Sequence, residues 1–150
     1  MSVPSPDRFQ LRPATSSDLP FWKRLHGLTM RAHVEAIWGW DEAVQDDLVR
    51  ARFRPEITAI ITVAGVDAGG LAREEVDGAI LLSVIMLLPD HQRRGIGTAL
   101  VRGLMAEAAG RGVAVRLSVL RPNPARHFYE RLGFITTSHD AIRFEMRWSP

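Results

Sequence analysis

Residues 79–98, AILLSVIMLLPDHQRRGIGT, carry the strongest structural signal in the chain. The first ten of them are almost continuously apolar, which predicts a β-strand in the centre of a sheet, covered on both faces. Pro89 follows the strand, and Gly95 and Gly97 stand where a helical pattern begins. Glycines let the backbone approach a ligand closely, and the N-terminus of a helix favours negative charge. The stretch therefore predicts a strand, an anion-binding loop and a helix in that order.

Two familiar phosphate-binding motifs do not fit this loop. A P-loop requires the pattern Gly-x-x-x-x-Gly-Lys-Ser/Thr, which the chain lacks. A dinucleotide fingerprint requires Gly-x-Gly-x-x-Gly, but position 100 is Leu100. Arg93 and Arg94 add positive charge beside the glycines. The loop is therefore still predicted to bind an anion, although neither of these two motifs describes it.

The rest of the chain predicts a mixed α/β fold around this strand. Helical spacing begins at Leu19 and again over 42–53, 95–109 and 124–132, and the segment 65–70 is expected to be a turn. The predicted strands are 9–12, 57–64, 71–76, 79–88, 113–119, 134–137 and 142–148. Strands interleaved with helices in this order predict a sheet with helices on both faces.

Composition limits the class of protein. A chain of 150 residues with 46% hydrophobic and 24% charged residues predicts one globular domain over 1–150. The absence of cysteine excludes disulfides, thiolate metal sites and cysteine nucleophiles. No histidine and carboxylate spacing is typical of a metal site, so no metal is expected. The arginines do not interleave with aromatic residues, so we expect no nucleic-acid partner.

No apolar run is long enough to cross a bilayer, since the longest covers 79–88. The first residues contain no apolar signal segment either, so we expect a cytoplasmic protein without a membrane partner.

Two motifs resemble those of the GNAT superfamily of N-acetyltransferases. Gln92, Gly95 and Gly97 match the Gln/Arg-x-x-Gly-x-Gly/Ala pattern of that family's acetyl-coenzyme A loop. Residues 123–134, NPARHFYERLGF, are similar to a later family segment that runs from an asparagine through an alanine and a tyrosine to a Gly-Phe pair. The opening residues 11–20 are similar to the family's first strand and helix. The resemblance therefore extends over nearly the whole chain.

The resemblance implies a mostly antiparallel sheet of six to seven strands and acetyl-coenzyme A as cofactor. The strand 79–88 would splay from the parallel strand 113–119, with the pantetheine arm in the gap. Asn123 would contact pantetheine, and Arg126 would contact the nucleotide. The implied cofactor contacts are the backbone of Met86, Leu87 and Leu88, then Gln92, Arg93, Arg94, Gly95, Ile96, Gly97 and Thr98, with Asn123, Arg126 and Tyr129.

The resemblance also places Tyr129, the one tyrosine of the chain, at the family's general-acid position. A tyrosine of ordinary pKa would give its proton to a thiolate at a cost of about 2 kcal/mol, so a hydrogen bond to sulfur is the safer expectation. The Leu87 N–H would polarise the thioester carbonyl. Many relatives carry a glutamate on the strand before the loop, but 79–88 contains no acid. Glu75 is then a weak candidate base, and strand alternation lets only one of Glu74 and Glu75 point inward.

The acceptor site is expected around the end of the first helix and the segment that follows it. His33, Glu35, Trp38 and Trp40 are the candidate acceptor-binding residues, and an acidic pocket there would favour a cationic amine. We therefore predict acetyl transfer to a primary amine, of a small molecule or a peptide, by direct attack in a ternary complex. The alternative is a non-catalytic acyl-coenzyme A-binding module, and a homodimer is compatible with either function.

Overall fold

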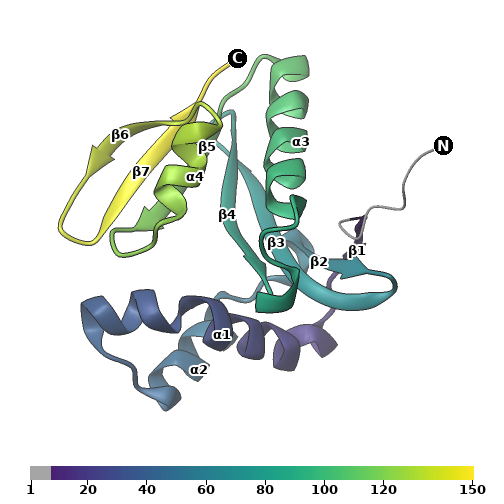
Figure 1. Ribbon diagram of the computed structural model, residues 1–150, viewed down its shortest axis with the longest axis vertical. Helices are drawn as coiled ribbons and strands as arrows, with labels where there is room; N and C mark the ends of the chain where they lie inside the picture. The colour runs from purple at the N-terminus through teal and green to yellow at the C-terminus, as the bar shows by residue number, and fades with distance from the viewer. Residues whose placement is uncertain (1–7) are drawn as a thin grey trace.

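The chain forms one seven-stranded sheet with helices on both faces (Figure 1). The computed structural model describes residues 8–150; residues 1–7, which the predicted domain includes, lie outside the described part. The spatial order of the strands is β1-β2-β3-β4-β5-β7-β6. The strands are β1 (Gln10–Pro13), β2 (Thr58–Val63), β3 (Val66–Val76), β4 (Ala79–Leu87), β5 (Val115–Leu120), β6 (Ile135–His139) and β7 (Arg143–Trp148).

The helices divide between the two faces of the sheet. They are α1 (Leu19–Trp38), α2 (Glu42–Arg52), α3 (Ile96–Arg111) and α4 (Ala125–Arg131), with 3₁₀ turns η1 (Ser16–Asp18), η2 (Pro55–Ile57) and η3 (Pro89–His91). α3 and α4 pack on one face, where Leu100 and Tyr129 join the larger buried cluster. α1 and α2 pack on the other face, where Trp22 and Val49 join the smaller one. The predicted order of elements and the mixed α/β fold are confirmed. Within residues 8–150, no helix combines the length and the apolar character needed to span a membrane.

The turn expected over 65–70 is much shorter in the structure, so that part of the prediction is wrong. Ala64 and Gly65 alone make the reversal, with φ of 52° and 78°, and β3 begins at Val66. The glycines at the end of the expected turn serve close packing instead. A Cβ on Gly70 would lie 2.0 Å from the Trp22 ring, so the bare backbone lets α1 dock against β3.

A bulge in β4 changes which side chains face which layer. Ala72 pairs with Val84 but Arg73 pairs with Leu82, so Ser83 is an extra residue on β4. Before the bulge, Ile80 and Leu82 join the cluster under α3; after it, Met86 joins the cluster under α1. Ser83 itself is exposed. Beyond the bulge, Ile85 packs against the cluster under α3 and Val84 against the cluster under α1, so the strand is covered on both faces as expected, except at Ser83.

β4 and β5 are parallel neighbours along only a short segment. Residues 80–82 pair with residues 115–117, and the pairing ends where the bulge begins. β5 continues instead with β7, which pairs with it from Val115 to Leu120. The strands therefore diverge toward the C-terminal end of β4, as the family resemblance implied, and the divergence is visible in Figure 1.

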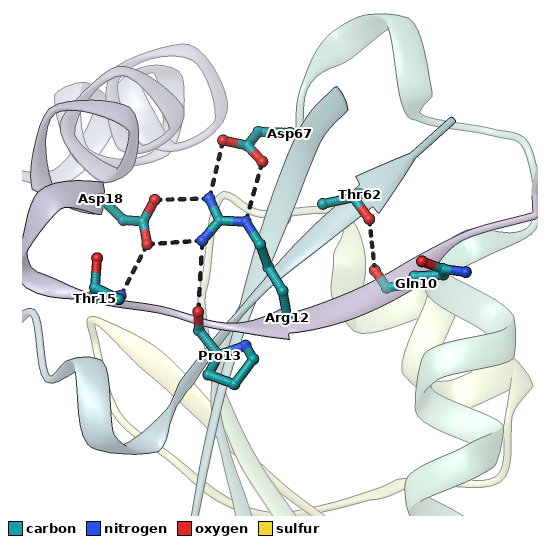
Figure 2. A network of polar contacts seen from close by, with 7 residues as sticks. All are labelled: Gln10, Arg12, Pro13, Thr15, Asp18, Thr62 and Asp67. Atoms are coloured by element: carbon teal, nitrogen blue, oxygen red, sulfur yellow. Dashed lines mark hydrogen bonds and ion pairs between the residues drawn. The ribbon is translucent and has the colours of Figure 1, made fainter. Parts of the chain in front are cut away.

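An arginine with two carboxylate partners holds the N-terminal elements together (Figure 2). Arg12 of β1 donates to both oxygens of Asp18, at 2.8 and 3.0 Å, and reaches Asp67 of β3 at 3.0 Å. Asp18 also accepts from the Thr15 N–H at 2.8 Å, and it is buried. Hydrogen bonds from Arg12 are the main cause that lowers the pKa of Asp18. The cluster fixes β1 and the entry to α1 beside β3.

Candidate active site

The N-terminus of α3 presents free amides to the loop that precedes it. Gly95 is the N-cap, and its φ of 84° is a left-handed conformation that glycine adopts without strain. The first intrahelical bond joins the Ala99 N–H to the Gly95 carbonyl at 3.0 Å. The N–H groups of Ile96, Gly97 and Thr98 therefore have no partner inside the helix. Three converging amides at a helix N-terminus are suited to a phosphate group.

The side chains of the loop divide into one internal brace and two exposed charges. Gln92 donates from Nε2 to the Leu87 carbonyl at 2.9 Å, so its amide holds the loop against the end of β4. Arg93, with φ of 62°, and Arg94 are exposed beside the free amides. Neither forms an ion pair with an acid among residues 8–150. The donor set, three amides and two guanidinium groups, fits a pyrophosphate.

The end of β4 offers fewer free backbone groups than expected. The Leu88 N–H donates to the Ala68 carbonyl at 2.8 Å, and Met86 pairs with Gly70 of β3. Both residues therefore direct their amides toward β3, and the expectation that the Met86 and Leu88 amides are unpaired is wrong. Because amides alternate along a strand, the Leu87 N–H points to the other side, where β5 has already diverged. Leu87 is thus the residue whose amide faces the gap.

Tyr129 lies in α4 next to the N-terminus of α3. Its ring meets those of Phe128 and Phe134 edge-on, at centroid distances of 5.1 and 5.5 Å. Phe128 in turn lies 3.8 Å from the position that a Cβ on Gly97 would take. Burial raises the pKa of Tyr129 to about 12, because the ionised form would lose its hydration. The phenol therefore keeps its proton at neutral pH and can act as a hydrogen-bond donor.

Asn123 and Arg126 have partners within the protein. Asn123 accepts from the Ala125 N–H through Oδ1 at 2.9 Å, and so caps the start of α4. The Arg126 guanidinium lies 4.3 Å from the centre of the Phe144 ring and pairs with Glu130 at 3.3 Å. These contacts orient both side chains. The contacts of Asn123 with pantetheine and of Arg126 with the nucleotide stay predictions.

A groove of about 740 Å³ opens on the opposite face of β4, between the α1–α2 pair and the strands. It reaches the point where β4 and β5 diverge, since Ser83, Val84 and Met86 of β4 and Leu120 of β5 line it. Its other lining residues are Trp22, His26, Met30, Val34, Trp38, Val44, Gln45, Leu48, Val49, Arg52, Phe53, Arg54, Ile57, Thr58, Ala72, Glu74 and Arg143. The volume is in the range of small-molecule sites.

Of the predicted acceptor residues, the structure places only Trp38 in this groove. His33 and Glu35 lie on other sides of α1: desolvation lowers the pKa of His33, and Glu35 pairs with Arg31 at 3.3 Å. Trp40 stacks on the outside of the groove residue His26 at 5.6 Å. The residues that sequence reasoning missed are Trp22, His26, Met30 and Val34. They recur every fourth position up to Trp38, so the stripe of one helix face was the available signal.

The two adjacent glutamates of β3, Glu74 and Glu75, have different surroundings. Glu74 lines the groove and pairs with Arg54 at 2.8 Å. Glu75 is exposed and pairs with Arg111 at the C-terminal end of α3 at 2.6 Å, away from the groove. The structure thus does not bring the candidate base Glu75 to the site. Three arginines and one acid line the groove, so the acidic pocket expected from the sequence is also absent from it.

Among residues 8–150, no three histidine or carboxylate side chains are grouped closely enough to hold a metal ion.

Comparisons with known proteins agree with this geometry. The sequence profile of the acetyltransferase (GNAT) domain matches residues 56–136, more than half of the chain. The PaiA N-acetyltransferase of Thermoplasma acidophilum, solved with coenzyme A, has a similar structure: 17% identity over 95% of this chain and 99% of that one, with a TM-score of 0.77. An acetyltransferase of Thermus thermophilus shares the fold, with 23% identity over 95% of this chain and 97% of that one and a TM-score of 0.71. A GNAT-family acetyltransferase of Listeria monocytogenes also shares it, with 16% identity over 95% of each chain and a TM-score of 0.64.

The profile match contains both the anion-binding loop and the tyrosine segment, and the full-length structural likeness contains the divergent strand pair. The chain therefore belongs to the GNAT superfamily of acetyltransferases.

Proposed function

We propose that the protein is an N-acetyltransferase that moves an acetyl group from acetyl-coenzyme A to a primary amine by direct attack in a ternary complex. The observation that carries this proposal is a meeting of three features at the C-terminal end of β4. The free amides of α3 lie beyond the end of the strand, the groove lies against its other face, and β5 has diverged from the strand between them. Such an arrangement suits a donor and an acceptor that enter from opposite faces.

The residues have distinct proposed roles. The N–H groups of residues 96–98 would hold the pyrophosphate, with Arg93 and Arg94 as charge partners. When bound, acetyl-coenzyme A supplies a thioester whose carbonyl carbon bonds to the amine nitrogen as its bond to sulfur breaks. The Leu87 N–H is directed to polarise that carbonyl oxygen. Tyr129 is a donor to the departing sulfur. With its pKa of about 12, full proton transfer to an ordinary thiolate would cost about 5 kcal/mol, so its role is a hydrogen bond.

The amine must lose a proton, and Glu74 is the carboxylate placed to assist. It is the acid that lines the groove among the described residues, and its side chain is 28% exposed. Its ion pair with Arg54 holds it in place, and water in the groove would carry the proton to it. Glu74 thus replaces Glu75 as the proposed base.

The test of the cofactor site is calorimetric titration with acetyl-coenzyme A of the parent protein and of Gly97→Glu. We expect micromolar binding by the parent and a loss of about 100-fold or more in the variant, because a carboxylate would stand beside the amides meant for phosphate. The measurement needs no acceptor.

Two control variants separate charge at the site from other effects. Gly97→Ala adds a Cβ at ordinary contact distance from Phe128, so it should bind within about threefold of the parent. Gly110→Glu places the same charge at the far, open end of α3 and should bind normally. No binding by a folded parent protein would refute the proposed function. Binding without transfer to any amine would instead indicate the acyl-coenzyme A-binding module.

A further inference from the structure

The charges that line the acceptor groove do not balance. Arg54 pairs with Glu74 at 2.8 Å and with Glu56 at 3.0 Å, so its charge is compensated. Arg52 and Arg143 also line the groove, and neither forms an ion pair with an acid among residues 8–150. The groove therefore carries uncompensated positive charge from two elements, the end of α2 and the start of β7.

Of the two acids near Arg143 in sequence, Asp140 is already engaged, and Glu145 forms no ion pair with Arg143 in the described part of the chain. Asp140 accepts the backbone N–H groups of Ile142 and Arg143 through Oδ1, at 2.8 and 2.9 Å. These backbone bonds are the main causes that lower the pKa of Asp140, ahead of the charge of Arg143. Arg143 lies opposite Leu120, the last residue of β5, in the β5–β7 pairing, and both residues line the groove. A guanidinium in this position can meet an anionic group of a bound molecule.

The remaining walls of the groove are mostly apolar. Trp22, Met30 and Val34 of α1 line it together with Val49 and Phe53. Three of the large hydrophobic side chains that are exposed in the described part of the chain also gather there: Trp38 (57% exposed), Val44 (51%) and Leu48 (37%). Exposed apolar side chains that cluster around one cavity are typical of a ligand site. The groove is thus suited to an apolar body with a negative charge.

We propose that the acceptor is a small amine that carries an apolar or aromatic body and a carboxylate, with Arg52 and Arg143 as the counter-charges of that carboxylate. This inference rests on the proposed function for the fate of the amine, but it concerns the groove alone. A cationic amine without an anionic group would meet two arginines that have no ion-pair partner within residues 8–150. The amino terminus of a peptide would lack the carboxylate at this place, so a peptide acceptor is the competing outcome.

The experiment compares amines of matched shape that differ in charge. Phenylalanine, phenylalaninamide and 2-phenylethylamine form one series; leucine, leucinamide and 3-methylbutylamine form a second. Binding is measured by tryptophan fluorescence, since Trp22 and Trp38 line the groove, and acetylation is measured separately with acetyl-coenzyme A. We expect the carboxylate in at least one series to bind about 10-fold or more tightly than its amide.

Arginine variants show whether that preference comes from the proposed residues. Arg52→Gln and Arg143→Gln should each reduce the preference for the carboxylate by about 3- to 30-fold and leave binding of the amide nearly unchanged. Arg50→Gln on α2 and Arg147→Gln on β7 are matched controls, because both residues are exposed and lie outside the groove. The controls should retain the preference.

The outcomes separate this inference from the proposed function. Equal binding of carboxylate and amide, stronger binding of the amide, or no binding in either series would overturn the inference; a preference for the amide would indicate a peptide amino terminus. A carboxylate preference in a protein that does not bind acetyl-coenzyme A would support the inference and refute the proposed function. Binding of acetyl-coenzyme A with no carboxylate preference would overturn the inference and leave the proposed function standing.

Discussion

The two sides of β4 differ in how they are paired. On one side, β3 follows β4 from Ala79 to Leu87, and the Leu88 N–H adds a further bond to Ala68. On the other side, β5 pairs with residues 80–82 and then diverges. The closed side binds the backbone of β4 to the sheet. The open side leaves the Leu87 amide facing a region that β5 does not cover.

The comparison shows how one strand can be both rigid and reactive. Unpaired backbone groups are costly when they are buried without a partner, so a sheet that opens must be held firmly elsewhere. Here β3 and the Arg12 cluster provide that support, because Asp67 is adjacent to the residue that bonds Leu88. The Ser83 bulge lies where the pairing of β4 with β5 ends, while its pairing with β3 continues. Substitutions on the closed side of β4 should therefore change the stability of the protein, whereas substitutions on the open side should change its activity.

The largest effect is expected from adding one methyl group where the backbones of β3 and β4 are already in close contact. A Cβ on Gly69 would lie 2.2 Å from the Met86 carbonyl oxygen and 3.1 Å from the Leu87 Cα. Both are backbone atoms, so Gly69→Ala should lower the free energy of unfolding by about 3 kcal/mol. Urea unfolding measures the change. The control Gly103→Ala, on an open face of α3, should raise the free energy of unfolding by about 0.5–1 kcal/mol. A loss below 1 kcal/mol for Gly69→Ala would mean that the closed side is not tightly packed.

The next effect tests the support of the closed side. Arg12→Met removes the partner of a buried carboxylate and should lower the free energy of unfolding by about 2 kcal/mol at pH 7. Arg8→Met, which changes an exposed arginine, is the control and should have little effect. Equal losses in the two variants would contradict the role of the cluster.

The same pair predicts a pH dependence with a definite sign. Arg12 lowers the pKa of Asp18 in the folded state, so the ionised carboxylate stabilises the fold above the unfolded value near 3.8. This contribution is lost as the pH falls below that value and through the folded pKa. The difference between parent and Arg12→Met should therefore shrink below about pH 4. A difference that is constant from pH 7 to pH 3 would contradict the assignment.

On the open side, Tyr129→Phe should lower kcat by about 10-fold or more and leave the affinity for acetyl-coenzyme A nearly unchanged. The ring stays in place, so only the hydroxyl is tested. Steady-state kinetics and calorimetry give the two quantities. A fall in affinity with an unchanged kcat would assign the hydroxyl to cofactor binding instead.

Alkaline titration checks the burial of the same hydroxyl, because the chain has one tyrosine. Absorbance near 295 nm should show ionisation at a pH of about 12 in the folded protein and near 10 in urea. The raised folded pKa means that the stabilising effect of the neutral phenol is complete below pH 10 and is lost as the pH rises toward 12. Tyr129→Phe should remove this alkaline loss of stability.

The smallest effects separate two neighbours on β3. Glu74→Gln should lower kcat/KM about 5- to 10-fold, because Glu74 lines the groove. Glu75→Gln should leave kcat/KM within about twofold of the parent, because Glu75 is exposed and pairs with Arg111. The reverse pattern would restore Glu75 as the candidate base.

Local sequence was sufficient for the cofactor loop and insufficient for the groove. The loop lies within one short stretch, where Gly95 and Gly97 follow a strand, so its conformation depends on neighbouring residues. The groove gathers residues from α1, α2, β3, β4, β5 and β7, and most of them are ordinary apolar residues. Trp40, His33 and Glu35 stand out by residue type, but they do not line the groove. Helix geometry instead places the residues at every fourth position from Trp22 to Trp38 on the side of α1 that lines the groove.

The sequence by itself determined the order of the elements, the mixed α/β class, the anion-binding loop and the position of the only tyrosine. Each of these depends on periodicity, glycine placement or a motif within a few residues. Only the tertiary structure decided where along β4 the pairing with β5 ends, which of Glu74 and Glu75 enters the groove, and which arginines lack acidic partners. Those outcomes depend on strand register: the single extra residue at Ser83 changes which side chains face each layer, and no local pattern records it.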